Sequence, residues 1–212
     1  MGRALKTAVL VLPILLVGCK IATIRPLEPE GEARDPQEFD AATYVDALWE
    51  EDLPAALEQA VDLGELLPAL AADPEAAGER WGRREGSGPF HVVVKGSGRV
   101  TDVDTSSRTG LARLDIQASD EDREILLQIG PVIRGTSIRD ALPTVSFDQF
   151  VNQIQYADVA NELNARVERE LLATLEREAL EGRQLRVTGM VTLSDDEVLT
   201  ITPVRLEVGG EP

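Results

Sequence analysis

Five segments in which apolar and polar residues alternate constrain this chain more than any other feature. Three of them follow one another between residues 90 and 129, and two more lie between residues 185 and 201. Alternation with a period of two and many β-branched residues are typical of strands with one buried face. In the first segment Gly96 and Gly98 interrupt the pattern, which predicts a bulge or a sharp bend that curves the sheet.

The segment between the third and fourth strands has a helical pattern. Apolar residues recur three or four positions apart from residue 147 to residue 175, Ser146 and Gln149 have the spacing of a capping box, and Gly182 suits a helix stop. These signals predict a long helix over residues 146–181, either continuous or broken near residues 161–164. Three strands, a helix and two strands are the order of the OB-fold, a five-stranded, partly open barrel. We therefore predict an α+β fold with an OB-fold-like barrel domain at residues 81–212.

Residues 38–80 have a different pattern, which predicts an N-terminal helical extension. Tyr44, Leu48 and Leu57 belong to a series of apolar residues at roughly helical spacing, with acidic residues between them. Pro54 and Pro68 interrupt the series, so we expect two or three short helices rather than one long helix. The apolar stripe is expected to pack against the barrel domain.

The first 18 residues have the pattern of a bacterial lipoprotein signal peptide. A short basic start with Arg3 and Lys6 precedes an apolar run that is too short to span a bilayer, which needs about 20 residues. The run ends in Leu-Val-Gly-Cys, which resembles a lipobox, with cleavage expected between Gly18 and Cys19. Cys19 is the only cysteine, so it has no disulfide partner in the chain. We predict that it is acylated and holds the protein on a membrane.

Residues 19–37 are rich in proline and acidic residues, which predicts an extended tether. The whole chain has a formal net charge of −17, and loss of Arg3 and Lys6 with the signal leaves the mature chain at −19. A chain this acidic is repelled by phosphate backbones and anionic head groups, so we predict no nucleic acid partner. The signal and lipid together predict a periplasm-facing protein of the cell envelope, anchored to either the inner or the outer membrane.

Several longer segments resemble a known family. They are residues 94–100 running into 104–110, residues 129–136 with 138–142, and residues 152–154 through 161–164, together with the lipobox. On these segments the chain resembles a family of predicted periplasmic lipoproteins of unknown function with an OB-like barrel. The resemblance implies the fold and the compartment but no activity. Members are often encoded beside sugar ABC-transporter genes, which implies a sugar ABC transporter or its binding protein as a partner.

A glycine-rich loop between the third strand and the helix is the first candidate binding site. It carries two fixed positive charges in a very acidic protein, and an arginine can clamp a carboxylate or phosphate with two hydrogen bonds. The alternative is that one arginine pairs internally with an acid such as Asp140 or Asp148 and holds the loop in place. The candidate residues of this loop are Arg134, Gly135, Thr136, Arg139 and Asp140.

A second candidate is an amide-rich surface on the predicted helix. Amides and an aromatic ring suit sugar hydroxyls and sugar faces, but amides also serve as helix caps and as partners for loop carbonyls. OB barrels that bind oligosaccharides use their strand face rather than their helix. The residues of this polar surface are Asn152, Gln153, Tyr156, Asn161 and Asn164.

The residues that common enzymes and metal sites require are scarce. His91 is the only histidine, and the alternation of its strand predicts that it faces outward. Asp102, Asp104 and Ser106 offer oxygen ligands, but their spacing lacks the glycine and the closing glutamate of a calcium loop. We therefore predict no catalytic residues, no cofactor and no metal.

These observations favour a non-enzymatic accessory or interaction module, tethered to a membrane and associated with sugar ABC-type uptake. The alternative is a binding module for a small ligand, a sugar or an anion, that uses the barrel face or the Arg134 loop.

Overall fold

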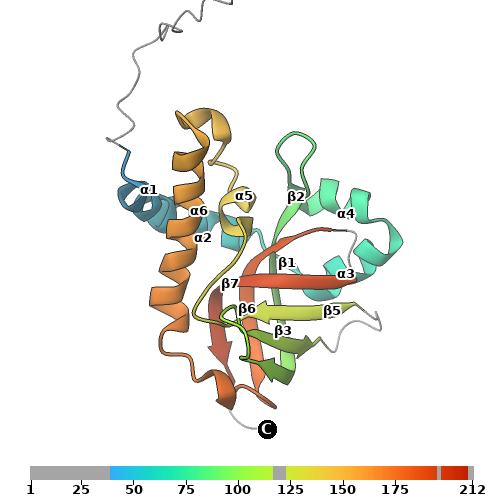
Figure 1. The fold of residues 1–212 in the computed structure, drawn as a ribbon. Helices are drawn as coiled ribbons and strands as arrows, with labels where there is room; N and C mark the ends of the chain where they lie inside the picture. Colours follow the sequence, from blue (N-terminus) through green and yellow to red (C-terminus); the bar gives the residue numbers. More distant parts are fainter. Residues whose placement is uncertain (1–38, 117–122, 195–196, 210–212) are drawn as a thin grey trace, which may run out of the picture. The chain divides into compact units, whose positions relative to one another are not determined.

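A closed barrel of five strands forms the centre of the protein. The computed structural model describes residues 39–116, 123–194 and 197–209 (Figure 1). The barrel runs in the order β3-β4-β5-β7-β6 and closes where β6 pairs with β3; the pair β5–β7 is parallel and the others are antiparallel. This confirms the predicted OB-fold topology. The strands are β3 (His91–Asp104), β4 (Leu111–Asp115), β5 (Glu124–Gln128), β6 (Gln184–Thr192) and β7 (Val198–Val208).

Strand β3 is long enough to pair with different neighbours along its length. It pairs with β6 from His91 to Arg99 and with β4 from Arg99 to Asp104, and the bulge lies between Val100 and Asp102. The bulge therefore follows the two glycines that predicted it. Gly98 has another role, because a Cβ at this position would lie 2.6 Å from the carbonyl oxygen of Asp115. Only glycine allows the two strands to approach so closely.

The N-terminal region forms four short α-helices and two strand fragments. Helices α1 (Ala41–Ala47) and α2 (Leu53–Glu58) are joined by a π-helical segment, η1 (Leu48–Asp52); α3 (Leu63–Ala72) and α4 (Pro74–Trp81) follow. The fragments β1 (Val61–Asp62) and β2 (Gly82–Arg83) both pair with β3, β1 in parallel and β2 antiparallel. The extension is thus part of the sheet as well as a set of helices.

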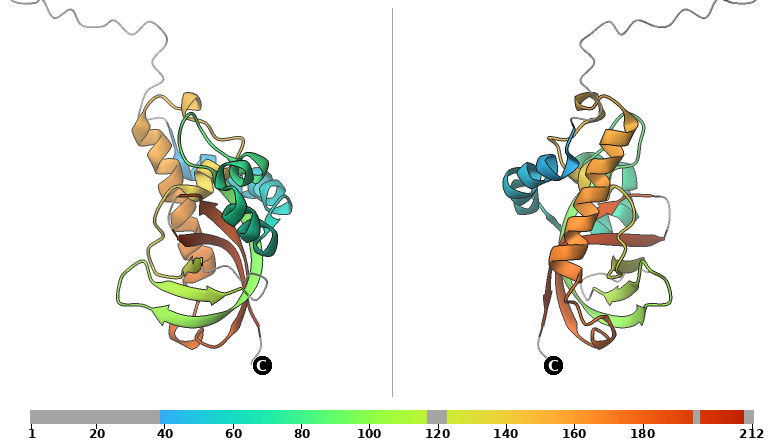
Figure 2. Two further views of the ribbon diagram at one scale, coloured as in Figure 1. Left: turned by 90° about the vertical axis from the view of Figure 1, so that its right-hand side faces the viewer. Right: turned by 60° about the vertical axis from the view of Figure 1, so that its left-hand side comes forward.

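Two hydrophobic clusters lie on either side of the barrel wall. One fills the barrel and extends to α3, with Val92, Leu127 and Ile201 fully buried. The other lies outside the wall, where Met190 of β6 packs with Leu163 of α6 and with residues of α1 and α2. Figure 2 shows α6 running along this outer side with α1 next to it. Both faces of the N-terminal half of β3 are therefore covered.

The predicted long helix over residues 146–181 is wrong in its extent. Helix α6 covers only Gln153–Val167 and continues as a π-helical segment, η3 (Glu168–Leu172); a separate 3₁₀ turn, η4, covers Arg177–Ala179. Residues 161–164 lie inside α6, so no break occurs there. The chain after η3 therefore reaches β6 through η4 and not through a continuous helix.

The predicted capping box also starts a different element. Ser146 and Gln149 close a single 3₁₀ turn, η2 (Phe147–Gln149), and the chain is extended again at Phe150. Asn152 then begins α6: its side-chain oxygen accepts hydrogen bonds from the N–H groups of Ile154 and Gln155, both at 3.0 Å. Asn152 therefore satisfies two of the N–H groups that a helix start leaves unpaired.

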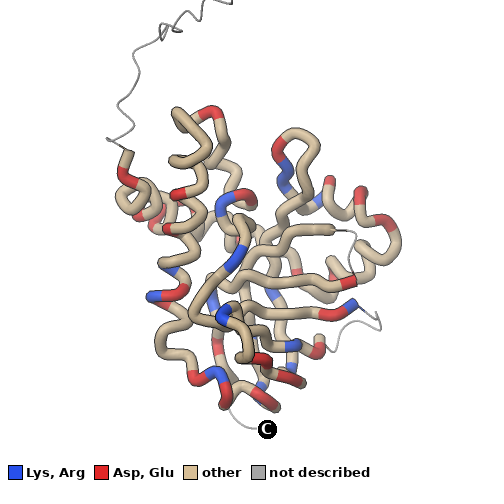
Figure 3. Tube along the Cα trace, viewed as in Figure 1, with Lys and Arg blue, Asp and Glu red and all other residues tan. Residues whose placement is uncertain are grey.

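Several predictions fall on residues outside the described ranges. The signal peptide at residues 1–18, the cleavage site at Gly18 and Cys19, and the tether at residues 19–37 are among them. In the part of the chain that is described, no helix has the length and apolar character needed to cross a membrane. Figure 3 shows acidic and basic residues spread over this part, with acidic but no basic positions on α1.

Candidate functional site

An open pocket of about 690 Å³ lies where the Arg134 loop meets the barrel. The loop before β4, the end of β5, the end of β6 and the start of β7 contribute to its wall. Threonine hydroxyls, one amide and one arginine provide most of its polar groups, and Glu197 adds a carboxylate. The polar residues that line it include Thr109, Gln128, Arg134, Thr192, Thr200 and Thr202.

Gln128 fixes the backbone of Arg134. Its side-chain Nε2 donates to the carbonyl oxygen of Arg134 at 3.0 Å, and the Arg134 N–H donates to Gln128 Oε1 at 2.8 Å. Nε2 also lies 2.9 Å from Thr202 Oγ1, to which Ser137 donates at 3.0 Å. Gln128 is 5% exposed, so this amide makes its hydrogen bonds away from bulk water. This role could not be predicted from the sequence, since Gln128 is one polar residue at the end of an apolar strand.

Two further contacts hold the rest of the loop. Asn164 of α6 donates to the carbonyl oxygen of Gly135 at 2.8 Å, and Thr136 donates to Asp140 Oδ2 at 2.5 Å. The Arg134 side chain is exposed and pairs with no other side chain of the described residues. The loop is thus held by hydrogen bonds from Gln128, Asn164 and Thr136, and Arg134, whose side chain is exposed, lines the pocket.

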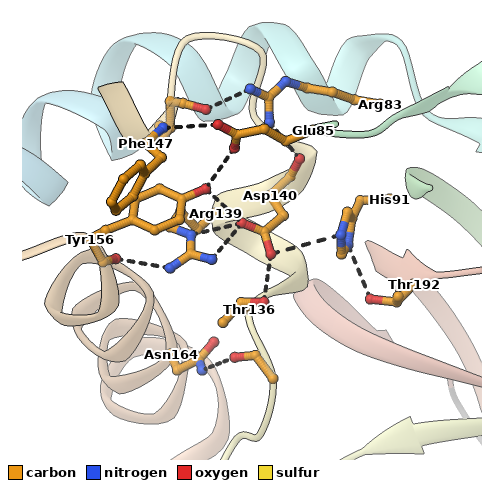
Figure 4. A network of polar contacts seen from close by, with 12 residues as sticks. Arg83, Glu85, His91, Thr136, Arg139, Asp140, Phe147, Tyr156, Asn164 and Thr192 are labelled. Carbon is orange, nitrogen blue, oxygen red and sulfur yellow. Dashed lines mark hydrogen bonds and ion pairs between the residues drawn. The ribbon is translucent and has the colours of Figure 1, made fainter. Parts of the chain in front are cut away.

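Arg139, in contrast, is an internal anchor. Its Nε and Nη2 atoms both lie 2.7 Å from Asp140 Oδ1, and Nη1 donates to the carbonyl oxygen of Tyr156 at 2.9 Å (Figure 4). The guanidinium also stacks 3.5 Å from the centre of the Tyr156 ring. Arg139 is buried in α5 (Ser137–Ala141), so it is not available to a ligand. The internal-pairing alternative therefore holds for Arg139 and Asp140, and not for Arg134.

Asp140 is the centre of a network that ties four elements together. Besides Arg139 and Thr136, it accepts a hydrogen bond from Tyr156 Oη of α6 at 3.2 Å. Tyr156 Oη also lies 3.1 Å from Glu85 Oε2 in the loop after β2. Burial and the nearby Asp140 carboxylate raise the pKa of Tyr156 to about 12, so the phenol keeps its proton and remains a donor.

Arg83 and Glu85 extend this network to the segment before η2. Arg83 Nη1 donates to the carbonyl oxygen of Asp140 at 2.9 Å, and Nη2 donates to that of Val145 at 2.7 Å. Glu85 Oε1 accepts from the Phe147 N–H at 3.2 Å. The network surrounds a hollow of about 170 Å³. Its charged groups bind one another or the backbone, so the network stabilises the fold and leaves no charged group for a ligand.

His91 lies on the outer face of β3, opposite Val92, as the alternation predicts, but this face is buried rather than exposed. The ring is 8% exposed, because the helices cover the outer face of β3. Its Nδ1 lies 3.1 Å from Thr192 Oγ1, and its Nε2 lies 3.7 Å from Asp140 Oδ2. Burial lowers the pKa of His91; Asp140 opposes this shift, and Arg139 and Arg83 add to it. The ring is therefore neutral at pH 7.

The row Thr192, His91 and Asp140 has the residue types of a nucleophile, a base and a carboxylate. His91 and Thr192 are, however, direct cross-strand partners in the β3–β6 pair, which accounts for their contact. The 3.7 Å separation between His91 and Asp140 is too long for the hydrogen bond that orients such a base. The row therefore has a structural explanation in strand pairing.

The burial of His91 predicts a pH dependence of stability. Its pKa is lowered from 6.5, so below that pH the unfolded chain binds a proton that the folded chain does not. The free energy of unfolding should therefore fall as the pH decreases through about 6.5, and level off below the folded-state pKa. In denaturant titrations from pH 7.5 to pH 5, the variant His91→Gln should lose less stability than the wild type. Equal losses would contradict this assignment.

The remaining candidate residues have separate roles. Asn152 caps α6, Asn164 holds the loop, and Tyr156 belongs to the Asp140 network, whereas Gln153 and Asn161 are exposed. They do not form one polar surface, because three of the five side chains bind the chain itself.

The oxygen-rich turn after β3 has a local explanation. Asp104 accepts a hydrogen bond from the Ser106 N–H at 2.8 Å, which is a common turn geometry, and Asp102 is exposed. Among the described residues no group of three or more potential metal ligands comes together.

Comparison with one solved structure supports the barrel topology. An OB-fold protein from Thermotoga maritima has a TM-score of 0.65 at 22% sequence identity, covering 81% of this chain and 99% of that chain. A lipoprotein from Klebsiella pneumoniae whose description suggests nucleic acid binding has a TM-score of 0.34 at 13% identity, covering 71% of this chain and 91% of that chain. No curated protein sequence matches the chain.

The family comparison covers nearly the whole chain. Residues 9–207 match the family described as predicted periplasmic lipoproteins, so the match includes the expected lipobox, the helical extension and all five barrel strands. It agrees with the periplasm-facing, lipid-anchored location expected from the N-terminus. The chain therefore belongs to the predicted periplasmic lipoprotein family DUF2291.

Proposed function

We propose that this lipoprotein is a non-enzymatic binding module that takes a small organic carboxylate in the pocket at the Arg134 loop. One observation carries the proposal: Gln128 binds both the N–H and the carbonyl oxygen of Arg134, a pocket-lining residue whose exposed side chain pairs with no other side chain of the described residues. Because its backbone is fixed, Arg134 can present its guanidinium from only one place on the loop. Preorganisation of this kind lowers the entropy cost of binding.

The pocket wall suggests the chemistry of the ligand. Arginine can hold a carboxylate with two parallel hydrogen bonds, and the nearby threonines Thr109 and Thr200 offer hydroxyls to a polyhydroxylated body. Glu197 lines the same pocket and repels additional negative charge. A singly charged sugar acid therefore fits the pocket better than a sugar phosphate with two negative charges.

The absence of enzymatic activity is part of the proposal. The Thr192–His91 contact is a strand-pair contact, and His91 is not aligned by Asp140. Among the described residues that line the pocket, Arg134 and Glu197 are the charged ones, and neither is paired with a nucleophile. These residue types suit binding rather than covalent chemistry.

We also propose that the module serves solute uptake, as an accessory to a sugar ABC transporter or its binding protein. The support is the location of the protein and the resemblance of its sequence to lipoproteins encoded beside such transporters. A tether keeps a bound ligand at high effective concentration near membrane proteins. Nucleic acid is not an expected partner, because the mature chain is strongly acidic.

Substitution of Arg134 tests the binding site. The mature protein, made without lipid as Cys19→Ser, should bind glucuronate more tightly than glucose 6-phosphate, and glucose least, in calorimetric titrations. Arg134→Gln should weaken glucuronate binding at least about tenfold, because it removes a charge-assisted pair of hydrogen bonds, and should leave the thermal midpoint unchanged.

Arg205→Gln is the matched control, since Arg205 is an exposed arginine of β7 that does not line the pocket. It should bind glucuronate like the parent protein. Equal binding of glucose and glucuronate, or equal effects of the two arginine substitutions, would refute the carboxylate site. If the protein binds none of these ligands but does bind the binding protein of a sugar transporter, the accessory role is supported and the carboxylate site is not.

A further inference from the structure

Three large apolar side chains are exposed close together at the start of α6. Phe147 is 40% exposed, Val151 52% and Ile154 71%, and they lie within eight positions of one another. We call these three residues the α6 apolar surface. Exposed apolar residues that are single and scattered need no explanation, but a local group of this kind marks a contact surface.

An aromatic cluster lies beneath this surface. Phe150 contacts the rings of Phe39, Tyr44 and Tyr156 with centroid distances of 5.6, 5.5 and 5.4 Å, and Phe147 packs on Tyr156 at 5.4 Å. Five of the eight aromatic residues of the chain are therefore gathered at one end of the molecule. Buried aromatic packing makes this end a firm support for the exposed side chains.

The chain enters the described domain at the same place. Phe39 is the first described residue, and Cys19 precedes it by 20 positions in the sequence. A chain segment of that length spans at most about 70 Å when fully extended. The lipid anchor therefore confines this end of the domain to the neighbourhood of a bilayer, where even a weak contact is populated.

The charges around the surface restrict the kind of contact. The sequence has no lysine or arginine at residues 35–79 or at residues 141–165, while Asp40, Asp148 and Asp158 are exposed and lie within four positions of a residue of this surface or of the aromatic cluster. The arginines that come close to this surface, Arg83 and Arg139, are bound to backbone carbonyls and to Asp140, so they are not free to attract anionic lipid head groups. Any contact with a bilayer has to rest on apolar burial, and acidic lipids oppose it.

We propose that the α6 apolar surface rests on the bilayer to which the protein is anchored, with Phe147, Val151 and Ile154 inserted at the boundary between head groups and acyl chains. This inference uses the lipid anchor and does not depend on the ligand of the Arg134 pocket. Side chains of this type enter the interface when the protein is held beside it. The contact orients the domain on the membrane.

A single introduced cysteine can test the contact, because Cys19 is the only native cysteine and carries the lipid. The lipidated full-length protein with Ile154→Cys, labelled with a fluorophore, is reconstituted into phosphatidylcholine vesicles that contain a lipid with a quencher near the head group. Quenching should be at least about threefold stronger than for a label at Ser107→Cys, since only the α6 site enters the interface. Ser107 lies in the β3–β4 loop, which projects from the side of the barrel, away from the start of α6, in both views of Figure 2.

Two further changes test the contact: the charge of the vesicle lipids and substitutions within the α6 apolar surface. Phosphatidylglycerol vesicles should reduce the quenching at position 154, and added salt should restore it, because the flanking aspartates are repelled by the anionic surface. Replacing Phe147 and Val151 with serine should abolish the difference between the two sites while the thermal midpoint stays near that of the parent, since both side chains are exposed. Equal quenching at both sites in phosphatidylcholine, or energy transfer between labelled copies in place of lipid quenching, would overturn the proposal.

Discussion

Replacing Asp140 with alanine should lower the free energy of unfolding by about 3 to 5 kcal/mol, the usual cost of breaking a buried ion pair by removing one partner. The reason is that Arg139 would remain buried with two of its hydrogen bonds lost. Thr136 and Tyr156 would lose their acceptor at the same time. Urea titrations monitored by circular dichroism measure the change.

Asp158→Ala is the control for this experiment, because Asp158 is an exposed acid on the same helix as Tyr156. It should change stability by less than about 0.5 kcal/mol. The double variant Asp140→Ala with Arg139→Met should be more stable than Asp140→Ala alone, since no buried charge is then left unpaired. A double variant that is less stable than the single one would show that Arg139 stabilises the fold through its contacts with Tyr156 even without Asp140.

Replacing Gly130 with alanine should also lower the free energy of unfolding by at least about 3 kcal/mol, which is the upper end of the usual range for overpacking. The effect is large because only backbone movement can relieve the overlap. A Cβ at this position would lie 1.9 Å from the carbonyl oxygen of Thr109 and 2.1 Å from its carbonyl carbon. The loop before β4 crosses the chain after β5 at this point, held by the hydrogen bond from Ile129 N–H to the oxygen of Gly110 at 3.0 Å.

Because Thr109 lines the Arg134 pocket, Gly130→Ala should weaken carboxylate binding as well as stability. Gly135→Ala is the comparison: an added Cβ there meets no atom within 4 Å, although a φ of +90° makes the residue strained. We expect that strain to lower the free energy of unfolding by about 1 kcal/mol. Thermal and denaturant unfolding of both variants measures the difference, and equal costs would contradict the packing argument.

The barrel could be predicted from the sequence because each strand carries its own alternation and the order of elements leaves few topologies. The start of α6 could not, for a physical reason. Phe147, Phe150 and Ile154 have helical spacing, but Phe150 reaches the core from an extended stretch, and Ile154 faces solvent. Spacing alone does not tell a helix from a chain that curves over the same surface.

In the candidate site, too, roles that depend on neighbouring residues could be predicted, and roles that depend on distant residues could not. Arg134 could be proposed from its charge and its glycine-rich loop, and Arg139 was open to two readings that only its burial separates. Gln128 and His91 acquire their roles from partners far along the chain, at Thr202 and at Asp140. Burial of the outer face of β3 depends on helices whose packing the strand pattern does not record.

The two small fragments β1 and β2 have a consequence for how the protein avoids self-association. Strand β4 does not reach the first part of β3, so one edge of β3 from His91 to Lys95 has no partner in the barrel. The fragment β2 pairs with His91 and Val92 on this edge, and β1 pairs with Val94 and Lys95. An apolar strand edge left bare is a template on which another chain can add a strand. Lipid anchoring concentrates copies in two dimensions, where such edge-to-edge growth would be fastest. The N-terminal extension therefore acts as a built-in guard against aggregation on the membrane.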